Sequence, residues 1–288
     1  MKLALGTVQF GLNYGIANPN GQVGMEEAQA IIRHAHGSGL DTLDTAVNYG
    51  DSEQRLGEIG VADWQVISKL PALPDQCEDI SKWIRNQVKA SLERMRITSL
   101  RGLLLHRPEQ LHGKHGKEIY QCLLALKQDG LVEKIGISIY DPIELDAFIR
   151  NFKIDLVQAP FNVLDRRLIT TGWMYKLMQM GIELHTRSVF LQGLLLMSPR
   201  LRPAQFNRWH STWQRWDQWL IETGLTPQQA CLRYAVAHIG IAQVIVGVDN
   251  VNQLKEIELS ALGSIPELPK ELNSTDIDLI NPGRWLNI

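Results

Sequence analysis

The 288-residue sequence predicts a single (β/α)8 barrel, and three observations lead to that fold class. Apolar runs short enough for strands alternate with segments of helical periodicity along the whole chain. The strand-like runs are apolar throughout, as is typical of parallel strands that are covered on both faces. Eight strand–helix pairs fit in the chain, and a barrel of this kind usually needs about 250 residues.

The first half of the chain supplies four strand-like runs, each followed by a helical segment. The second run precedes a helix for which Ser52 is the expected N-cap. After the third run, apolar residues recur at helical spacing from Ile80 to Met95, which predicts a long amphipathic helix. The four runs are residues 3–7, 43–46, 64–70 and 100–106.

The second half continues the alternation, with runs at residues 134–138, 155–162, 182–188 and 242–248. Pro142 suits the first turn of the helix after the fifth strand. Residues 168–181 are expected to form one helix that ends at Gly181. Residues from about 265 are expected to form a C-terminal tail that wraps the barrel, with Trp285 as an anchor.

An insertion after the seventh strand places Trp209, Trp213 and Trp216 on one face of a predicted helix, and Trp219 extends that face. Three interpretations stay open at this point. The stripe packs the inserted helix onto the barrel, it forms a wall or lid beside the active site, or it forms a subunit interface.

Composition excludes several classes of function. A net charge of −2, from 29 basic and 31 acidic residues, gives no electrostatic footprint for nucleic acid or for an acidic membrane. No apolar run approaches the length of about 18 residues that spans a membrane. The three cysteines are scattered and no metal-binding spacing is present, so we expect a metal-independent cytoplasmic protein.

Polar residues recur where the predicted strands end. Because catalytic residues of such barrels lie at the carboxyl ends of the strands, these positions are the candidates for a site. Singly, each also has a structural interpretation, such as a turn carboxylate or a core histidine. In chain order they are Thr7, Asp44, Lys69, His106, Ser138, Gln158, Arg187 and Gly247.

Together, Asp44, Lys69, His106 and the loop residue Tyr49 make a chemical hypothesis. A nearby lysine is expected to lower the pKa of Tyr49, which is otherwise near 10. Asp44 would offset the buried charge of Lys69, and His106 could orient a carbonyl oxygen. This set suits the protonation of a carbonyl oxygen while its carbon receives a hydride.

The segments "LDTAVNYGDSEQRLG", "VISKL", "LLLHRP", "KIGIS" and "VQAPFN" resemble the aldo-keto reductase superfamily over nearly the whole chain. The resemblance implies a barrel that reduces aldehydes or ketones reversibly with NADPH or, less often, NADH. It assigns the catalytic tetrad to Asp44, Tyr49, Lys69 and His106, with Tyr49 as general acid. It further implies a cofactor site that includes Thr7, Ser138, Gln158, Arg187, Ser188, Phe190, Gly247, Asp249 and Gln253.

The sequence departs from the pattern of that superfamily at three places. Ile139 stands where an asparagine usually follows the serine of strand five. Arg187 replaces an aromatic residue, and we expect it to bias cofactor binding or to recruit an anionic substrate. Asp249 and Gln253 stand where cations often grip a 2′-phosphate; Asp249 either accepts a ribose hydroxyl or merely caps the last helix. Both cofactors stay open, with the balance slightly toward NADH.

Two other functions remain as alternatives. One is a nucleotide-sensing regulatory subunit built on the same barrel. The other is a lyase or aldolase in which Lys69 forms a Schiff base with the substrate. For the reductase, the sequence indicates a small carbonyl substrate, with anionic and sugar-like compounds as candidates, and it does not predict the oligomeric state.

Overall fold

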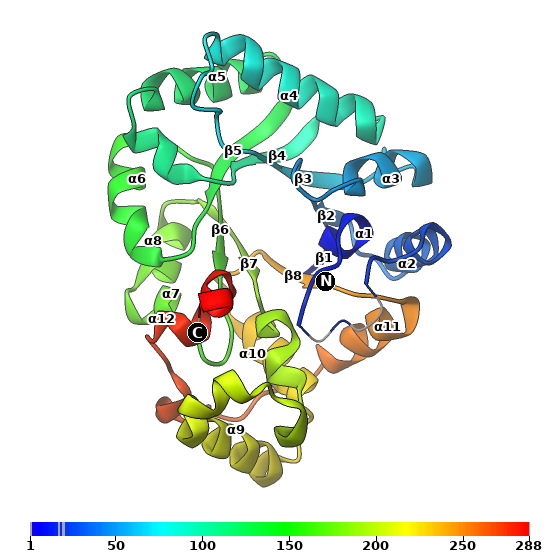
Figure 1. Cartoon of the computed structure of the whole chain (residues 1–288), viewed down its shortest axis with the longest axis vertical. Helices are drawn as coiled ribbons and strands as arrows, with labels where there is room; N and C mark the ends of the chain where they lie inside the picture. The colour runs from blue at the N-terminus through cyan, green and yellow to red at the C-terminus, as the bar shows by residue number, and fades with distance from the viewer. Residues whose placement is uncertain (1, 17, 19–20, 288) are drawn as a thin grey trace.

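The computed structural model describes residues 2–16, 18 and 21–287, and its centre is a closed barrel of parallel strands in chain order (Figure 1). Each strand pairs with its sequence neighbours, and β8 closes the ring against β1. The predicted (β/α)8 barrel is therefore confirmed. The strands are β1 (Leu3–Gly6), β2 (Thr42–Asp44), β3 (Gln65–Leu70), β4 (Leu100–Leu105), β5 (Val132–Ser138), β6 (Leu156–Pro160), β7 (Glu183–Arg187) and β8 (Gln243–Gly247).

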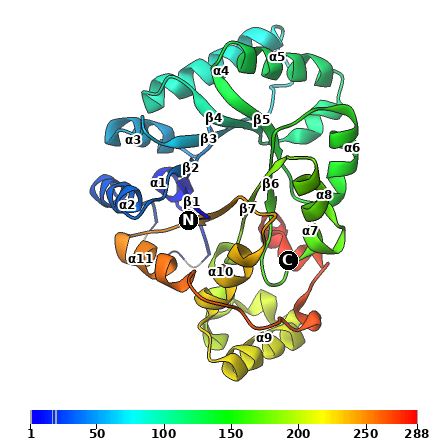
Figure 2. The ribbon, with the colours of Figure 1, turned by 180° about the vertical axis from the view of Figure 1, so that it is seen from behind.

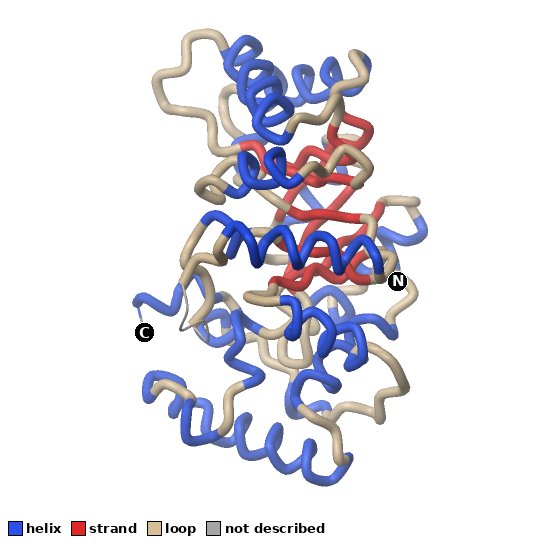
Figure 3. The backbone as a smooth tube through the Cα atoms, turned by 90° about the vertical axis from the view of Figure 1, so that its right-hand side faces the viewer, coloured by secondary structure: helices blue, strands red, loops and turns tan. Residues whose placement is uncertain are grey.

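Helices form the outer layer around the strands, as the side view in Figure 3 shows. Their apolar faces pack inward; α4, for example, buries Ile80, Ile84 and Val88 at the predicted spacing. The helices are α1 (Val8–Gly11), α2 (Met25–Gly37), α3 (Ser52–Ile59), α4 (Ile80–Met95), α5 (Gly116–Gln128), α6 (Leu145–Asn151), α7 (Arg167–Thr170), α8 (Trp173–Gln179), α9 (His210–Thr223), α10 (Pro227–Ala237), α11 (Val251–Ser260) and α12 (Ile277–Ile280).

Short 3₁₀ segments lie mainly in the loops and in the C-terminal tail. One of them, η2, begins at Pro142, and the side chain of Asp141 caps it by accepting a hydrogen bond from Ile143 N. The segments are η1 (Pro108–His112), η2 (Pro142–Glu144), η3 (Leu191–Leu196), η4 (Pro199–Leu201), η5 (Ala204–Trp209), η6 (Lys270–Leu272) and η7 (Pro282–Asn287).

Two expectations about helix boundaries were wrong. Residues 168–181 do not form one helix, because Gly172 adopts a φ of 76° and separates α7 from α8. Ser52 is not an N-cap but the first residue of α3, and the preceding Asp51 makes no side-chain cap. The Ser52 hydroxyl instead donates to the carbonyl oxygen of Thr7 at 2.9 Å, which ties α3 to the end of β1.

The tryptophan stripe belongs to the hydrophobic core. Trp209, Trp213, Trp216 and Trp219 are all buried, and Figures 1 and 2 both place α9 at the edge of the molecule, away from the strands. The indole of Trp213 donates to the carbonyl oxygen of Phe206 at 2.9 Å. Trp285 packs edge-on against Phe206 at 4.9 Å between ring centroids, so the tail is anchored there. These contacts support the packing interpretation of the stripe.

The interior of the barrel has an apolar middle with a polar end on each side. Ile67, Leu104 and Leu156 form a small cluster of their own inside the ring. Side chains two residues apart on a strand share a face, so Lys69 and Gln158 lie one layer further toward the carboxyl ends of the strands. That end carries the candidate site. In the described part of the chain, no helix is long and apolar enough to cross a membrane.

Candidate active site

A buried ion pair lies at the carboxyl end of the barrel. Lys69 Nζ lies 2.6 Å from Asp44 Oδ2 and donates a second hydrogen bond to the carbonyl oxygen of Thr45 at 2.9 Å. The other carboxylate oxygen, Asp44 Oδ1, accepts from Gln158 Nε2 at 2.6 Å. Because β2 and β6 are not neighbours in the ring, this last contact requires both side chains to point into the barrel.

Tyr49 and His106 complete the cluster. Tyr49 lies in the loop between β2 and α3, and its ring centroid is 5.0 Å from Lys69 Nζ. His106 directly follows β4, and its ring meets the ring of Tyr49 edge-on at 6.2 Å between centroids. The four residues that the resemblance assigned to a tetrad therefore meet at one end of the barrel.

The balance of charges at Tyr49 differs from the sequence-based expectation. Burial raises the pKa of Tyr49, and although the charge of Lys69 opposes that shift, the pKa still stands above its usual value. The expectation that Lys69 lowers this pKa below 10 was wrong, because desolvation of the phenolate outweighs attraction by the ammonium group. Burial also lowers the pKa of Lys69, but Asp44 and Tyr49 more than offset it, so Lys69 stays charged.

His106 is neutral at physiological pH. Burial, and then the positive charges of Lys69 and Arg187, lower its pKa from 6.5 to about 4. A neutral imidazole has one N–H donor and one acceptor nitrogen. It can therefore donate a hydrogen bond to a carbonyl oxygen without carrying charge into the site.

A cavity of about 400 Å³ opens beside the tetrad. Asp44 and Tyr49 line it, and it extends from β1 past the loop after β7 to the start of α11. Seven of the nine residues predicted to bind the cofactor line the same cavity: Thr7, Arg187, Ser188, Phe190, Gly247, Asp249 and Gln253. The other two are Ser138, the last residue of β5, and Gln158 in the middle of β6, and they pair in register.

Ser138 of β5 and Gln158 of β6 suit a nicotinamide carboxamide. Gln158 Oε1 is buried without a hydrogen-bond partner among the described residues, and a buried acceptor of this kind usually has one. The buried hydroxyl of Ser138 lies beside it in the register of the two strands. Ile139 is fully buried and has no polar side-chain atom, so it adds nothing to this polar set.

The start of α11 carries a carboxylate that faces the cavity. Asn250, not Asp249, caps this helix, since its side chain accepts a hydrogen bond from Gln253 N at 2.9 Å; the capping interpretation of Asp249 was therefore wrong. Asp249 Oδ1 is buried without a partner in the described part of the chain, and burial raises the pKa of this carboxyl group. The amide oxygen of Gln253 accepts from Asp249 N at 2.8 Å.

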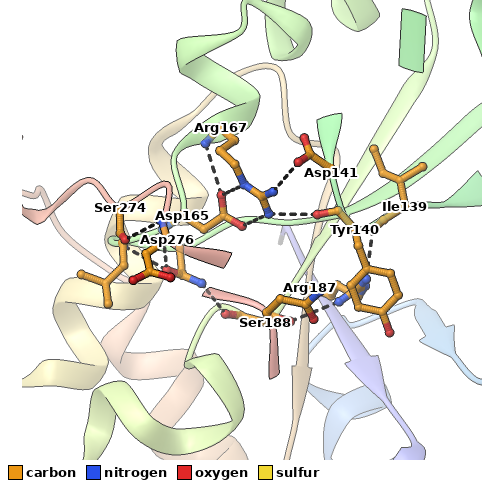
Figure 4. Close-up of polar contacts among 12 residues, drawn as sticks. Ile139, Tyr140, Asp141, Asp165, Arg167, Arg187, Ser188, Ser274 and Asp276 are labelled. Atoms are coloured by element: carbon orange, nitrogen blue, oxygen red, sulfur yellow. Dashed lines mark hydrogen bonds and ion pairs between the residues drawn. The ribbon is translucent and has the colours of Figure 1, made fainter. Parts of the chain in front are cut away.

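Arg187 reaches across the end of the barrel to the loop after β5 (Figure 4). Its Nη2 donates to the carbonyl oxygen of Ile139 at 3.0 Å, and its guanidinium carbon lies 4.5 Å from the ring centroid of Tyr140. Figure 4 also shows Arg167, which donates to the carbonyl oxygen of Tyr140 at 2.9 Å. Sequence reasoning named Arg187 but not Tyr140.

Further cavity-lining residues were missed by the sequence reasoning: Gln9, Tyr14, Gln192, Gln228 and Glu256. Gln9 follows the first strand closely and packs on Gly247, where a Cβ atom would lie 2.4 Å from Gln9 Nε2. Tyr14 and Gln192 join two loops through a hydrogen bond of 3.2 Å. Only Gln9 carried a signal in the sequence, as a polar residue near a strand end.

The loop after β7 has an unusual backbone where it lines the cavity. Ser188 and Gln192 have positive φ angles of 62° and 52° although neither is glycine. Such conformations cost free energy and are concentrated at functional sites. The residues that the structure describes include no cluster of His, Cys, Asp and Glu that could hold a metal ion.

Comparisons with known proteins agree with this geometry. The chain is 24% identical to L-galactose dehydrogenase from Arabidopsis thaliana, covering 94% of this chain and 91% of that protein. It is 22% identical to L-glyceraldehyde 3-phosphate reductase from Escherichia coli, covering 95% and 89%. The holo form of the aldo-keto reductase AKR11C1 from Bacillus halodurans superposes with a TM-score of 0.70 at 20% identity, over 92% of this chain and 88% of that one.

A sequence profile of the Aldo/keto reductase family matches residues 2–271, which is most of the chain. Members of this family are oxidoreductases that use NAD(P)H. With the closed barrel and the cluster at its carboxyl end, the match leads to one conclusion: the chain belongs to the Aldo/keto reductase family.

Proposed function

We propose that the protein reduces an aldehyde or ketone with NAD(P)H, and reversibly oxidises the alcohol, with Tyr49 as the proton donor. The observation that carries the proposal is the meeting of Asp44, Lys69, Tyr49 and His106 beside a cavity large enough for a small ligand. When bound, a reduced nicotinamide supplies the hydride. The residues of the chain supply the proton and hold the reacting groups.

The hydroxyl of Tyr49 is protonated at neutral pH, since its pKa stands above the usual value. It can donate this proton because the carbonyl oxygen becomes a much stronger base as its carbon receives the hydride. Loss of that proton creates a phenolate, and the ammonium group of Lys69, 5.0 Å from the ring centroid, stabilises it. Asp44 keeps Lys69 charged and fixed at 2.6 Å. The neutral imidazole of His106 donates a hydrogen bond that orients the carbonyl oxygen toward Tyr49.

The charges that line the cavity support NADH over NADPH. Asp249 precedes α11 and Glu256 lies within it, and Arg187 is the one cation among the cavity-lining residues that the structure describes. A carboxylate with a free oxygen accepts a hydrogen bond from a ribose hydroxyl and repels a 2′-phosphate. The ratio of kcat/KM for NADH to that for NADPH tests this preference.

For the substrate we propose a small carbonyl compound of the sugar-aldehyde class. Support comes from two family members of 24% and 22% identity whose names specify L-galactose and L-glyceraldehyde 3-phosphate. The second of these substrates is anionic, and Arg187 offers a positive charge at the cavity. Neutral and phosphorylated aldoses are therefore the compounds to compare first.

Schiff-base chemistry at Lys69 is less well supported. The side chain is 1% exposed, and its raised pKa keeps it protonated, whereas an attacking amine must be neutral. Trapping with borohydride in the presence of candidate aldehydes would leave an adduct on Lys69 only if the enzyme were an aldolase or lyase. The reductase proposal predicts no adduct.

The test of the proposed function is the oxidation of NADH and NADPH across a panel of aldehydes, ketones and aldoses, together with direct binding of both cofactors. We expect substrate-dependent oxidation with at least one compound. Binding of a cofactor without turnover on any compound would contradict the proposal and favour a nucleotide-sensing subunit. We place the protein in the cytoplasm as part of the same proposal, which localisation of a tagged full chain would check.

A further inference from the structure

Arg187 is a cation without a counter-ion at a site where the reaction changes the charge of the cofactor. Among the residues that the structure describes, no carboxylate lies within ion-pair distance of it. Among those residues it contacts only uncharged groups: the carbonyl oxygen of Ile139 at 3.0 Å, the hydroxyl of Ser188 at 3.4 Å and the ring of Tyr140 at 4.5 Å. Its full positive charge therefore acts on the cavity that it lines.

The neighbouring Arg167 does not line the cavity, and its guanidinium is neutralised by carboxylates. Arg167 lies 2.9 Å from Asp141 and 2.8 Å from Asp165, and it also holds the carbonyl oxygen of Tyr140 (Figure 4). The hydrogen bond fixes the backbone of Tyr140, whose ring packs against Arg187. Tyr140 is thus a positioning residue, because it faces Arg187 and is itself anchored by a neutralised arginine.

The charge of Arg187 reaches the reacting groups. It contributes to the lowered pKa of His106, after burial and Lys69, and it opposes the raised pKa of Tyr49. A nicotinamide held by Ser138 and Gln158 and reacting beside Tyr49 would lie at the same end of the barrel as Arg187. The oxidised ring is a cation and the reduced ring is neutral, whereas both forms carry the same diphosphate.

We propose that Arg187, held in place by Tyr140, makes the site bind the reduced nicotinamide cofactor more tightly than the oxidised one. Repulsion between two positive charges in a partly buried site weakens binding of the oxidised form, while attraction to the diphosphate is common to both forms. The oxidised cofactor therefore dissociates more readily, which speeds product release in the direction of carbonyl reduction. This inference rests on the proposed function, since it requires that the cavity binds the cofactor.

The experiment measures equilibrium dissociation constants for NADH and NAD⁺ by fluorescence and by calorimetry; if the phosphorylated pair binds better, NADPH and NADP⁺ take their place. The quantity of interest is the ratio of Kd for the oxidised form to Kd for the reduced form, because losses at the diphosphate cancel in it. We expect this ratio to exceed one in the wild type and to fall about tenfold in Arg187→Met and in Arg187→Gln.

Three further variants sharpen the test. Arg187→Lys keeps the charge and should retain most of the ratio, and Tyr140→Leu should lower it about threefold by releasing the guanidinium. Arg107→Met removes an exposed cation next to His106 that does not line the cavity, and it should leave the ratio unchanged.

The possible outcomes separate this inference from the proposed function. A ratio that stays within twofold of the wild type in Arg187→Met and Arg187→Gln, while both forms still bind, overturns the inference and leaves the proposed function intact. An unchanged ratio with a raised KM for phosphorylated but not neutral aldoses would instead assign Arg187 to the substrate. A wild-type protein that binds neither form overturns both.

Discussion

The two ends of the barrel both carry charged side chains, but the cations described below are paired with carboxylates at one end, whereas at the other end the cation that lines the cavity is not. At the amino-terminal end, Lys134 and Arg101 both pair with Glu183, and Lys127 pairs with Asp155. At the carboxyl-terminal end, Asp44 neutralises Lys69, whereas Arg187 has only uncharged contacts among the described residues. Glu183 and Arg187 are the first and last residues of the same strand, β7.

The difference separates charge that stabilises the fold from charge that is available to a ligand. Removing the partner of a buried, paired cation destabilises the fold, because the remaining charge is left uncompensated. A cation or a buried polar atom without a partner beside a cavity is a candidate for contact with a ligand. The carboxyl-terminal end has two such atoms: Asp249 Oδ1 belongs to the cavity lining, and Gln158 Oε1 lies on a side chain that contacts Asp44 of that lining.

The largest effect is expected for Asp44→Asn, at the end that carries the tetrad. The substitution keeps the shape but leaves the charge of Lys69 buried without a counter-ion, so the free energy of unfolding should fall by about 3 kcal/mol. We expect kcat/KM to fall by about 10²-fold as well, because Lys69 loses its fixed position. Urea denaturation and steady-state kinetics measure the two losses, and full activity in this variant would remove Asp44 from the mechanism.

The pH dependence of turnover sharpens the same comparison. Because the pKa of His106 is lowered to about 4, the imidazole is neutral at pH 5 and above. The acidic limb of kcat/KM should therefore lie near pH 4 and not near 6.5. The unfolded chain takes up this proton near pH 6.5, so the lowered pKa destabilises the fold as pH falls from 6.5 toward 4.

An NMR titration of the His106 ring checks the assignment of that limb, with His106→Gln as the control spectrum. A midpoint near 6.5 for this ring would show that burial and the neighbouring charges do not act as described.

At the opposite end, Glu183→Gln should change stability without changing chemistry. Hydrogen bonds from His185 lower the pKa of Glu183 to about 2. Burial opposes this shift, and hydrogen bonds from Lys134 add to it. A lowered carboxyl pKa stabilises the fold above pH 4.5, and this contribution disappears as pH falls toward 2. We expect Glu183→Gln to cost about 2 kcal/mol at pH 7, with kcat/KM within twofold of the wild type.

A control variant and one contradicting outcome complete this test. Exposed Glu133 also pairs with Arg101, at 3.1 Å, so Glu133→Gln is a matched control that should cost less than about 1 kcal/mol. If Glu183→Gln lowered kcat/KM tenfold, the division between a stabilising end and a reacting end would fail.

The smallest effect concerns the choice of cofactor. Glu256→Lys places a cation in the part of the cavity lined by α11, where the proposed NADH preference requires that Asp249 and Glu256 repel a 2′-phosphate. We expect kcat/KM for NADPH relative to NADH to rise about tenfold. Steady-state kinetics with both cofactors measure the ratio, and an unchanged ratio would place the 2′-phosphate elsewhere.

Much of the fold was readable from the sequence because a barrel repeats one simple pattern. Apolar strands, helical periodicity and polar strand ends recur, so the barrel and the positions of Asp44, Lys69 and Gln158 followed from spacing. The break at Gly172 was missed because apolar periodicity continues through it and does not show that this glycine adopts a positive φ.

The net pKa shift of a residue on which several opposing effects act could not be predicted from the sequence. Whether Tyr49 has a raised or a lowered pKa depends on how far burial outweighs Lys69, and burial is a property of the folded chain. Likewise Tyr140 is an ordinary loop residue in the sequence. Its role follows only from the 4.5 Å between its ring and the guanidinium of Arg187.

The most direct test of the account is single-turnover hydride transfer in Tyr49→Phe, with the best carbonyl substrate of the panel. The substitution removes only the hydroxyl, so the Kd for the reduced cofactor should stay within about twofold of the wild type. The rate of hydride transfer should fall by at least about 10²-fold, because no group replaces the lost acid. A variant that keeps the wild-type rate would contradict the claim that Tyr49 donates the proton.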